Sequence, residues 1–180
     1  MKKKLLSLIL LLSCFLIIGC GKEMTPKQAV DDYLQRYITL DDSIMDQLNE
    51  FVNKEDLTDE QKLTYKEVLR NQYSSLTYTL KDEKIEGDTA YVTAKIKVKD
   101  LYKAQMNAQE YYNEHKEEFN DDNGVYDAVK FLNYKLLQMK EATDTKEYEI
   151  EFKVIKNDND WDVSQLSNED LEKIHGIYEY

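Results

Sequence analysis

The sequence predicts an α+β fold, in which N-terminal helices pack on a small antiparallel sheet of about four strands and a helical hairpin is inserted between the second and third strands. Two observations support this prediction. Apolar residues recur at helical spacing over residues 25–76 and 100–142, and they alternate with polar residues over 76–98 and from residue 148 onward. The few Gly and Pro residues of this region also fall where the patterns change. They are Pro26, Gly87, Gly124 and Gly176.

The first twenty residues differ from the rest of the chain. Three lysines precede an apolar run, Leu5–Ile18, of about 14 residues, fewer than the roughly 20 that a membrane-spanning helix needs. A basic start followed by a short apolar stretch is typical of a secretory signal peptide. The end of this segment, Ile17-Ile18-Gly19-Cys20, resembles the lipobox of bacterial lipoproteins. That resemblance implies cleavage before Cys20, after its thiol has been diacylated.

Two alternatives are an ordinary secretory signal that contains a cysteine and an uncleaved anchor. The first would leave an exposed thiol, and the second an anchor too short to span a bilayer. Two acyl chains hold a protein firmly on a bilayer, so a diacylglyceryl group on Cys20 gives a stable anchor. We therefore expect a signal peptide at residues 1–19, a lipidated tether at 20–24 and a single α+β domain at 25–180. The expected location is the extracytoplasmic side of the cell membrane.

The charge and the cysteines limit the possible partners and chemistry. The chain has 24 Lys and Arg against 36 Asp and Glu, and removal of residues 1–19 leaves 21 basic residues against the same 36, a side-chain charge of −15. Nucleic acid is excluded as a partner because phosphate binding relies on clustered Lys and Arg. Cys14 is lost with the signal peptide, so the mature chain keeps no free thiol.

Three helices are predicted before the first strand. Thr25-Pro26-Lys27-Gln28 is a start signal, with Thr as N-cap, Pro at the first helical position and Gln three residues after the cap. Asp41-Asp42 interrupts the apolar pattern, and a shorter amphipathic segment follows. A second capping signature, Thr58 with Gln61, opens the third helix. The apolar positions are Ala29, Val30, Tyr33, Leu34, Tyr37 and Ile38, then Ile44, Met45, Leu48, Phe51 and Val52, then Tyr65, Val68, Leu69, Tyr73 and Leu76.

The first two strands form a predicted hairpin whose register follows from their apolar residues. In an antiparallel pair the apolar residues of both strands must share one face. A two-residue loop at Gly87-Asp88 would by itself place Leu80 opposite a lysine. We therefore predict a three-residue loop, Glu86–Asp88, or a bulge nearby. The expected pairs are Leu80 with Ala94 and Tyr78 with Ile96.

The helical hairpin is predicted over residues 100–142. Asp100 can cap its first helix, and Asn120–Gly124 break the helical spacing before the second. After the hairpin, alternation returns, and a two- or four-residue loop within Asn157–Asp160 places Val154 opposite Val163. A last helix then begins at Ser167 and ends at Gly176.

The mature chain offers few groups for catalysis. Its two imidazoles are His115, expected to pack on the apolar face of a helix, and His175, in the last turn of the final helix, where the helix dipole favours a cation. Gly-x-Ser-x-Gly, His-Glu-x-x-His and phosphate-binding glycine loops are all absent from the sequence. We therefore expect no catalytic residues, no cofactor and no enzymatic activity.

One acidic segment has part of the spacing of a calcium loop. Four carboxylates occupy positions 1, 3, 5 and 12 of the EF-hand pattern. Position 6 is Val163 where Gly is needed, and the preceding segment alternates as a strand where a helix is needed. We therefore predict a polar hairpin tip and no metal site. The four carboxylates are Asp158, Asp160, Asp162 and Glu169.

The order of these features resembles uncharacterised small lipoproteins of low-GC Gram-positive bacteria, whose mature part looks like a nuclear-transport-factor-two-like or cystatin-like domain. The resemblance implies a curved sheet packed on a long helix, although the helical hairpin departs from the simplest cone-shaped fold. Such domains share no common activity. The residues that carry the likeness are the lipobox, Thr25-Pro26, Ala29-Val30, Tyr33-Leu34, the strand Gly87–Val92 and Trp161.

These observations favour a non-catalytic binding or protein-interaction module at the cell envelope, whose partner is an envelope protein or a small ligand. The alternative is an inhibitor of a secreted enzyme or an immunity-type lipoprotein, and an envelope hydrolase is less favoured. The curved sheet would leave a concave face. Five aromatic residues are candidates to line that face as a pocket or to form plain core, and core is the favoured reading. They are Tyr33, Tyr37, Tyr78, Tyr148 and Trp161.

Overall fold

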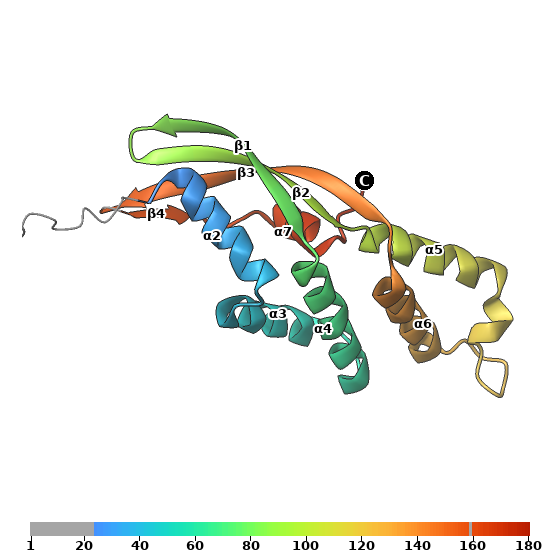
Figure 1. Ribbon diagram of the computed structural model, residues 1–180. Helices are drawn as coiled ribbons and strands as arrows, with labels where there is room; N and C mark the ends of the chain where they lie inside the picture. The colour runs from blue at the N-terminus through green and yellow to red at the C-terminus, as the bar shows by residue number, and fades with distance from the viewer. Residues whose placement is uncertain (1–23, 159) are drawn as a thin grey trace, which may run out of the picture.

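The computed structural model describes residues 24–158 and 160–180, and it has the predicted α+β fold (Figure 1). The sheet is antiparallel with the order β1-β2-β3-β4, and a helical hairpin of α5 and α6 lies between β2 and β3, as predicted. In chain order the elements are α2 (Pro26–Ile38), α3 (Asp42–Lys54), α4 (Asp59–Ser74), β1 (Thr77–Glu86), β2 (Thr89–Lys99), α5 (Leu101–Glu114), η2 (Lys116–Phe119), α6 (Ala128–Glu141), β3 (Thr145–Asn157), β4 (Asp160–Val163) and α7 (Asn168–His175).

The expected signal peptide and lipidation site, with Ile17, Ile18, Gly19 and Cys20, lie outside the described residues. Within the described part of the chain, no helix is long and apolar enough to cross a membrane.

Local capping sets the helix starts where the sequence placed them. Thr25 and Gln28 form a complete capping box at α2, and Thr58 and Gln61 form another at α4. The side chain of Ser167 accepts a hydrogen bond from the backbone of α7. These contacts satisfy backbone N–H groups that the first turn of a helix leaves free.

The strand pairs of the β1–β2 hairpin agree with the prediction, but the loop does not. Leu80 pairs with Ala94, and Tyr78 pairs with Ile96. The loop has only two residues, Gly87-Asp88, so the predicted three-residue loop is wrong. The alternative, a nearby bulge, is correct, because the register shifts by one residue between Leu80 and Glu83. The φ of +63° at Gly87 suits the tight turn, and the bulge restores the apolar alternation.

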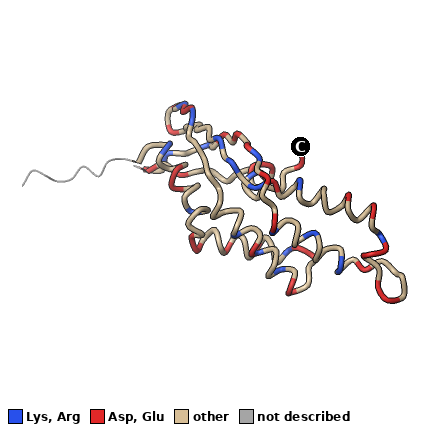
Figure 2. The backbone as a smooth tube through the Cα atoms, turned by 45° about the vertical axis from the view of Figure 1, so that its right-hand side comes forward, with Lys and Arg blue, Asp and Glu red and all other residues tan. Residues whose placement is uncertain are grey.

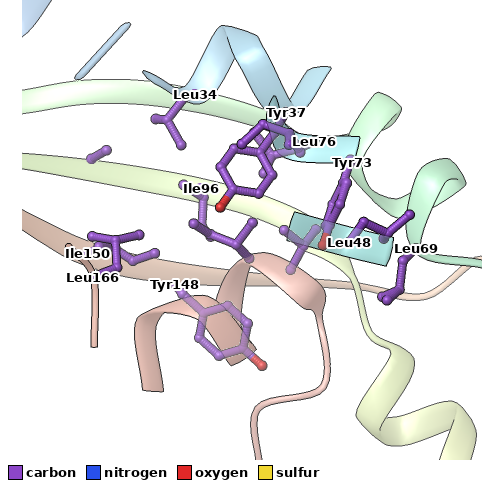
Figure 3. Close-up of a cluster of buried hydrophobic side chains, with 14 of the residues drawn as sticks. Leu34, Tyr37, Leu48, Leu69, Tyr73, Leu76, Ile96, Tyr148, Ile150 and Leu166 are labelled. Carbon is purple, nitrogen blue, oxygen red and sulfur yellow. The ribbon is translucent and has the colours of Figure 1, made fainter. Parts of the chain in front are cut away.

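The sheet is covered by helices on one face and open on the other. On β2 and β3 the inward residues are fully buried, and helices α2, α4 and α7 contact the sheet on this side (Figures 1 and 3). The open face carries alternating polar side chains, with ion pairs between Lys81 and Glu149 and between Lys95 and Glu147. Val154 pairs with Val163, as predicted.

Candidate functional site

The helical hairpin extends beyond the end of the sheet and has a small core of its own (Figure 1). Along the hairpin, the main core extends only as far as Ala104 in α5 and Leu136 in α6. Farther out, Ala108 and Phe119 are buried but lie outside the main core. We call residues 110–131, the far end of this structure, the hairpin tip.

Phe119 and six other rings lie together in or beside the hairpin tip, and we call these seven the aromatic cluster. Phe119 is only 4% exposed, and its ring centroid lies 5.6 Å from that of Tyr112 and 5.3 Å from that of Tyr134. The other rings are half-exposed or exposed, so the cluster has one buried centre and an accessible rim. Counting Phe119 itself, the members are Tyr111, Tyr112, His115, Phe119, Tyr126, Phe131 and Tyr134.

The loop Asn120–Asp127, which we call the tip loop, is held in one conformation by its own hydrogen bonds. One carboxylate oxygen of Asp121 accepts hydrogen bonds from the backbone N–H groups of Asn123 and Val125, both at 2.9 Å. These two donors lower the pKa of Asp121, because they stabilise the ionised carboxylate. A β-bridge between Asn120 and Tyr126 closes the loop.

This ordered loop presents apolar side chains to solvent. Val125 is 62% exposed, Tyr126 is 46% exposed, and Val129 in the first turn of α6 is 49% exposed. Tyr126 packs on Tyr112, with ring centroids 5.3 Å apart, so it joins the exposed loop to the aromatic cluster. The arrangement is an apolar surface on a preformed support.

The hairpin tip is also strongly acidic (Figure 2). It holds seven carboxylates against two lysines, so it contributes −5 to the formal net charge of −12 of the whole chain. Among residues 24–158 and 160–180, none of these carboxylates forms an ion pair, whereas carboxylates of the sheet and of α3, α4 and α7 do. The seven are Glu110, Glu114, Glu117, Glu118, Asp121, Asp122 and Asp127, and the two lysines are Lys116 and Lys130.

The five aromatic residues singled out in the sequence lie in the main core or against it. Tyr37, Tyr148 and Trp161 are core members, and Tyr33 and Tyr78 are partly buried against the core (Figure 3 labels Tyr37 and Tyr148). Tyr37 packs on Tyr73 edge to face, at 5.1 Å between ring centroids. Burial raises the pKa of Tyr148 to about 12. The five come from α2, β1, β3 and β4, and they hold these elements together.

The structure corrects the prediction for His175. The sequence suggested a cation at the end of the last helix, but the side chain is only 8% exposed and stacks on Phe51, with 4.9 Å between ring centroids. Its Nδ1 lies 2.7 Å from the hydroxyl oxygen of Tyr73. Burial lowers the pKa of His175 to about 4, because the charged form would be desolvated. His175 is therefore neutral at pH 7.

His115 lies in the aromatic cluster, in the packing role that the sequence predicted. It is half-buried at the end of α5 and stacks on Tyr111, with 4.0 Å between ring centroids. Its Nδ1 lies 3.0 Å from the carbonyl oxygen of Tyr111.

The carboxylates with partial calcium-loop spacing have other contacts. Asp162 accepts a hydrogen bond from the side chain of Asn157 at 2.8 Å, and Glu169 in α7 pairs with Lys173 at 2.7 Å. Asp158 and Asp160 lie at the turn between β3 and β4. Within the described ranges, no group of three or more His, Cys, Asp or Glu side chains could hold a metal ion.

Several hollows on the main body are open to solvent, and charged side chains form part of their lining. One of about 540 Å³ lies between α3 and α4 and is lined in part by Lys66, Glu67 and Arg70. Another of about 290 Å³ lies where α5 and α6 join the sheet, and Asp100, Lys103 and Asp144 line it. A small-molecule pocket usually encloses most of its ligand, so neither of these open hollows resembles one.

Comparison with known proteins identifies no family for this chain. No protein-family description matches the sequence, and no curated protein matches it. Among solved structures, it is similar to ycdA, a candidate lipoprotein from Bacillus subtilis subsp. subtilis str. 168, with 18% sequence identity and a TM-score of 0.45. The match covers 68% of this chain and 39% of that chain. A similarity at this level supports no conclusion about function.

Helical spacing in the sequence did not reveal the hairpin tip as a candidate site. It places Tyr111, Tyr112 and Phe119 on the apolar face of one helix. In the structure α5 ends at Glu114 and Phe119 lies in η2, and spacing alone did not show how much of this apolar face stays exposed. The available signal was the density of aromatic and acidic residues over 110–131.

Proposed function

We propose that this protein is a lipid-anchored, non-catalytic interaction module on the extracytoplasmic side of the cell membrane. The lipobox-like sequence Ile17–Cys20 supports the anchor, with diacylglyceryl Cys20 as its attachment to the bilayer. The proposal keeps the chain among small Gram-positive lipoproteins with a nuclear-transport-factor-two-like or cystatin-like domain.

The observation that carries the interaction role is the exposed aromatic surface of the hairpin tip. Tyr and Phe are enriched at protein–protein interfaces, where they supply large contact areas at low conformational cost. Here the tip loop is already ordered by Asp121, so binding would not have to order it. An inhibitor or immunity-type lipoprotein would act through the same kind of contact.

The anchor is tested by fractionation of cells that produce the full-length protein. Cys20→Ala should move the protein from the membrane to the soluble extracellular fraction. Cys14→Ala is the matched control and should leave it on the membrane, because Cys14 lies within the signal peptide. Membrane retention of the Cys20 variant, at the wild-type level, would refute the lipid anchor.

The interaction role is tested by photo-crosslinking in cells. A photoreactive phenylalanine analogue replaces Val125 in the full-length protein, and in a second strain it replaces Leu63 of α4, which is 69% exposed. We expect a discrete covalent adduct with another protein from position 125 and none from position 63. Equal labelling at both positions, or no adduct at 125, contradicts the proposal. Hydrolysis of a cell-wall or peptide substrate by the purified protein would contradict the non-catalytic part.

A further inference from the structure

We propose that the hairpin tip docks a cationic protein segment, one that is rich in Lys or Arg and carries at least one apolar side chain. This inference rests on the proposed interaction role and adds the place of binding and the chemistry of the partner. Two independent properties of the tip support it, namely its apolar surface and its unpaired charge.

The apolar surface favours a partner that carries an apolar side chain. Val125, Tyr126 and Val129 expose about half of their surface or more, and the first two belong to a loop that hydrogen bonds hold in place. Exposed apolar groups on a rigid support bind with a smaller entropy cost than groups on a flexible loop. An aliphatic or aromatic side chain of the partner could pack against Tyr126 and the rim of the aromatic cluster.

The negative charge around this surface favours a partner segment that carries Lys or Arg. Glu147 and Glu149 on the open sheet face are each paired with a lysine, Glu147 with Lys95 at 2.6 Å. Glu117 and Asp122 at the hairpin tip are exposed and have no ion-pair partner in the described part of the chain. A basic segment would supply the missing positive charge, and attraction between the two would speed their association.

The same charge disfavours the other possible occupants of the surface. A second copy of this chain, docked tip to tip about a two-fold axis, would bring two acidic rims together. A bilayer of anionic lipids would repel the tip within about 8 Å, the screening distance at physiological salt. Both would leave the carboxylates unpaired, whereas a cationic protein segment pairs them.

The test measures binding of labelled synthetic peptides to the full-length protein in detergent, by fluorescence anisotropy. The probe is a peptide of about a dozen residues that combines Lys with Trp and Leu, and a second peptide has Glu in place of each Lys. We expect the lysine peptide to bind and its affinity to fall as salt is raised, because exposed charges are screened. Equal binding of the glutamate peptide would overturn the proposal.

Matched variants locate the binding site. The double variant Glu117→Gln, Asp122→Asn should weaken binding of the lysine peptide several-fold. Asp46→Asn with Glu172→Gln removes the same charge from exposed positions on α3 and α7 and should leave binding unchanged. Val125→Ser with Tyr126→Ser should weaken binding by about tenfold, because it removes the apolar contact. If both charge variants weaken binding equally, only net charge attracts the peptide and the proposal is wrong.

The two proposals can fail separately. Loss of folding in the Val125 and Tyr126 variant would show in its circular dichroism, and the surface charge variants, which remove no apolar contact, would still decide the question. If the peptides do not bind but position 125 still crosslinks to a protein in cells, the interaction role stands and the cationic partner is wrong.

Discussion

The main core and the hairpin tip both bury aromatic rings, but to different depths. In the main core, Tyr37 and Tyr73 are each 2% exposed or less, because a helical layer and a sheet enclose them. In the hairpin tip, Phe119 is the one buried ring, at 4% exposed, and its neighbours form a half-exposed rim. A pair of helices can cover only the stripes that face each other. Residues of the same aromatic types therefore stabilise the fold in the main core and form an accessible surface in the hairpin tip.

The largest expected effect is a difference between the two regions in how much they contribute to the free energy of unfolding. Phe152→Ala removes a ring that is 0% exposed, and it should lower the free energy of unfolding of the whole domain by about 3–5 kcal/mol. Phe119→Ala should mainly loosen residues 108–134 and lower the global value by less than half as much. Urea unfolding followed by circular dichroism measures the global value, and hydrogen exchange measures local opening. Equal global losses would show that the tip and the body unfold as one cooperative unit.

A pH experiment tests the buried histidine of the main body. The pKa of His175 is about 4 in the folded state against 6.5 for an ordinary histidine, so between these values the unfolded chain binds a proton that the folded chain does not. Stability should therefore fall as pH is lowered through this range, by about 3 kcal/mol for this group. His175→Gln should remove that part of the pH dependence.

Wild type and the His175 variant must be compared at each pH, because carboxylates titrate in the same range. Parallel stability curves for the two would mean that His175 does not stay neutral in the fold.

The sequence was informative wherever the structure depends on near neighbours. The capping residues Thr25, Thr58 and Ser167 act within three residues of themselves, so their patterns predicted helix starts correctly. The alternation of apolar residues predicted the strand pairs, because register depends on which face is buried. The loop length was not determined in this way, since a bulge and a longer loop change the register equally.

Contacts distant in sequence account for the errors. His175 is neutral because Phe51 and Tyr73 surround it, and neither is near it in the chain. In the same way, the exposure of the hairpin tip depends on which elements pack on it: in the described structure α4 contacts α6, yet Val125 and Tyr126 stay exposed. Helical spacing reveals which face is apolar but not what covers it.

Two glycines with left-handed backbone allow a matched comparison of the regions. A Cβ at Gly176, where φ is +74°, would lie 2.3 Å from the carbonyl oxygen of Lys99 and 2.8 Å from Nε2 of Gln72. Gln72 is buried and bridges Lys99 and Ile174, so Gly176→Ala should cost about 2–3 kcal/mol of unfolding free energy. Gly124→Ala in the tip loop, with φ of +78° and nothing within 4 Å, should cost about 1 kcal/mol. A larger effect at Gly124 would mean that the tip loop contributes more to folding than its open surroundings suggest.

The smallest expected effects come from helix caps, one in each region. Thr25 caps α2 on the main body, and Thr25→Ala should lower the free energy of unfolding by about 1 kcal/mol. Asp127 caps α6 at the tip, where one carboxylate oxygen accepts hydrogen bonds from the N–H groups of Val129 and Lys130. Asp127→Ala should change global stability by less than about 0.5 kcal/mol but increase hydrogen exchange in the first turn of α6. Because Val129 lies in that turn, Asp127→Ala should also weaken binding of the lysine peptide, whereas Thr25→Ala should not. If Asp127→Ala lowers the global free energy of unfolding as much as Thr25→Ala does, the hairpin tip contributes to folding as the main body does, and the distinction between the two regions is wrong.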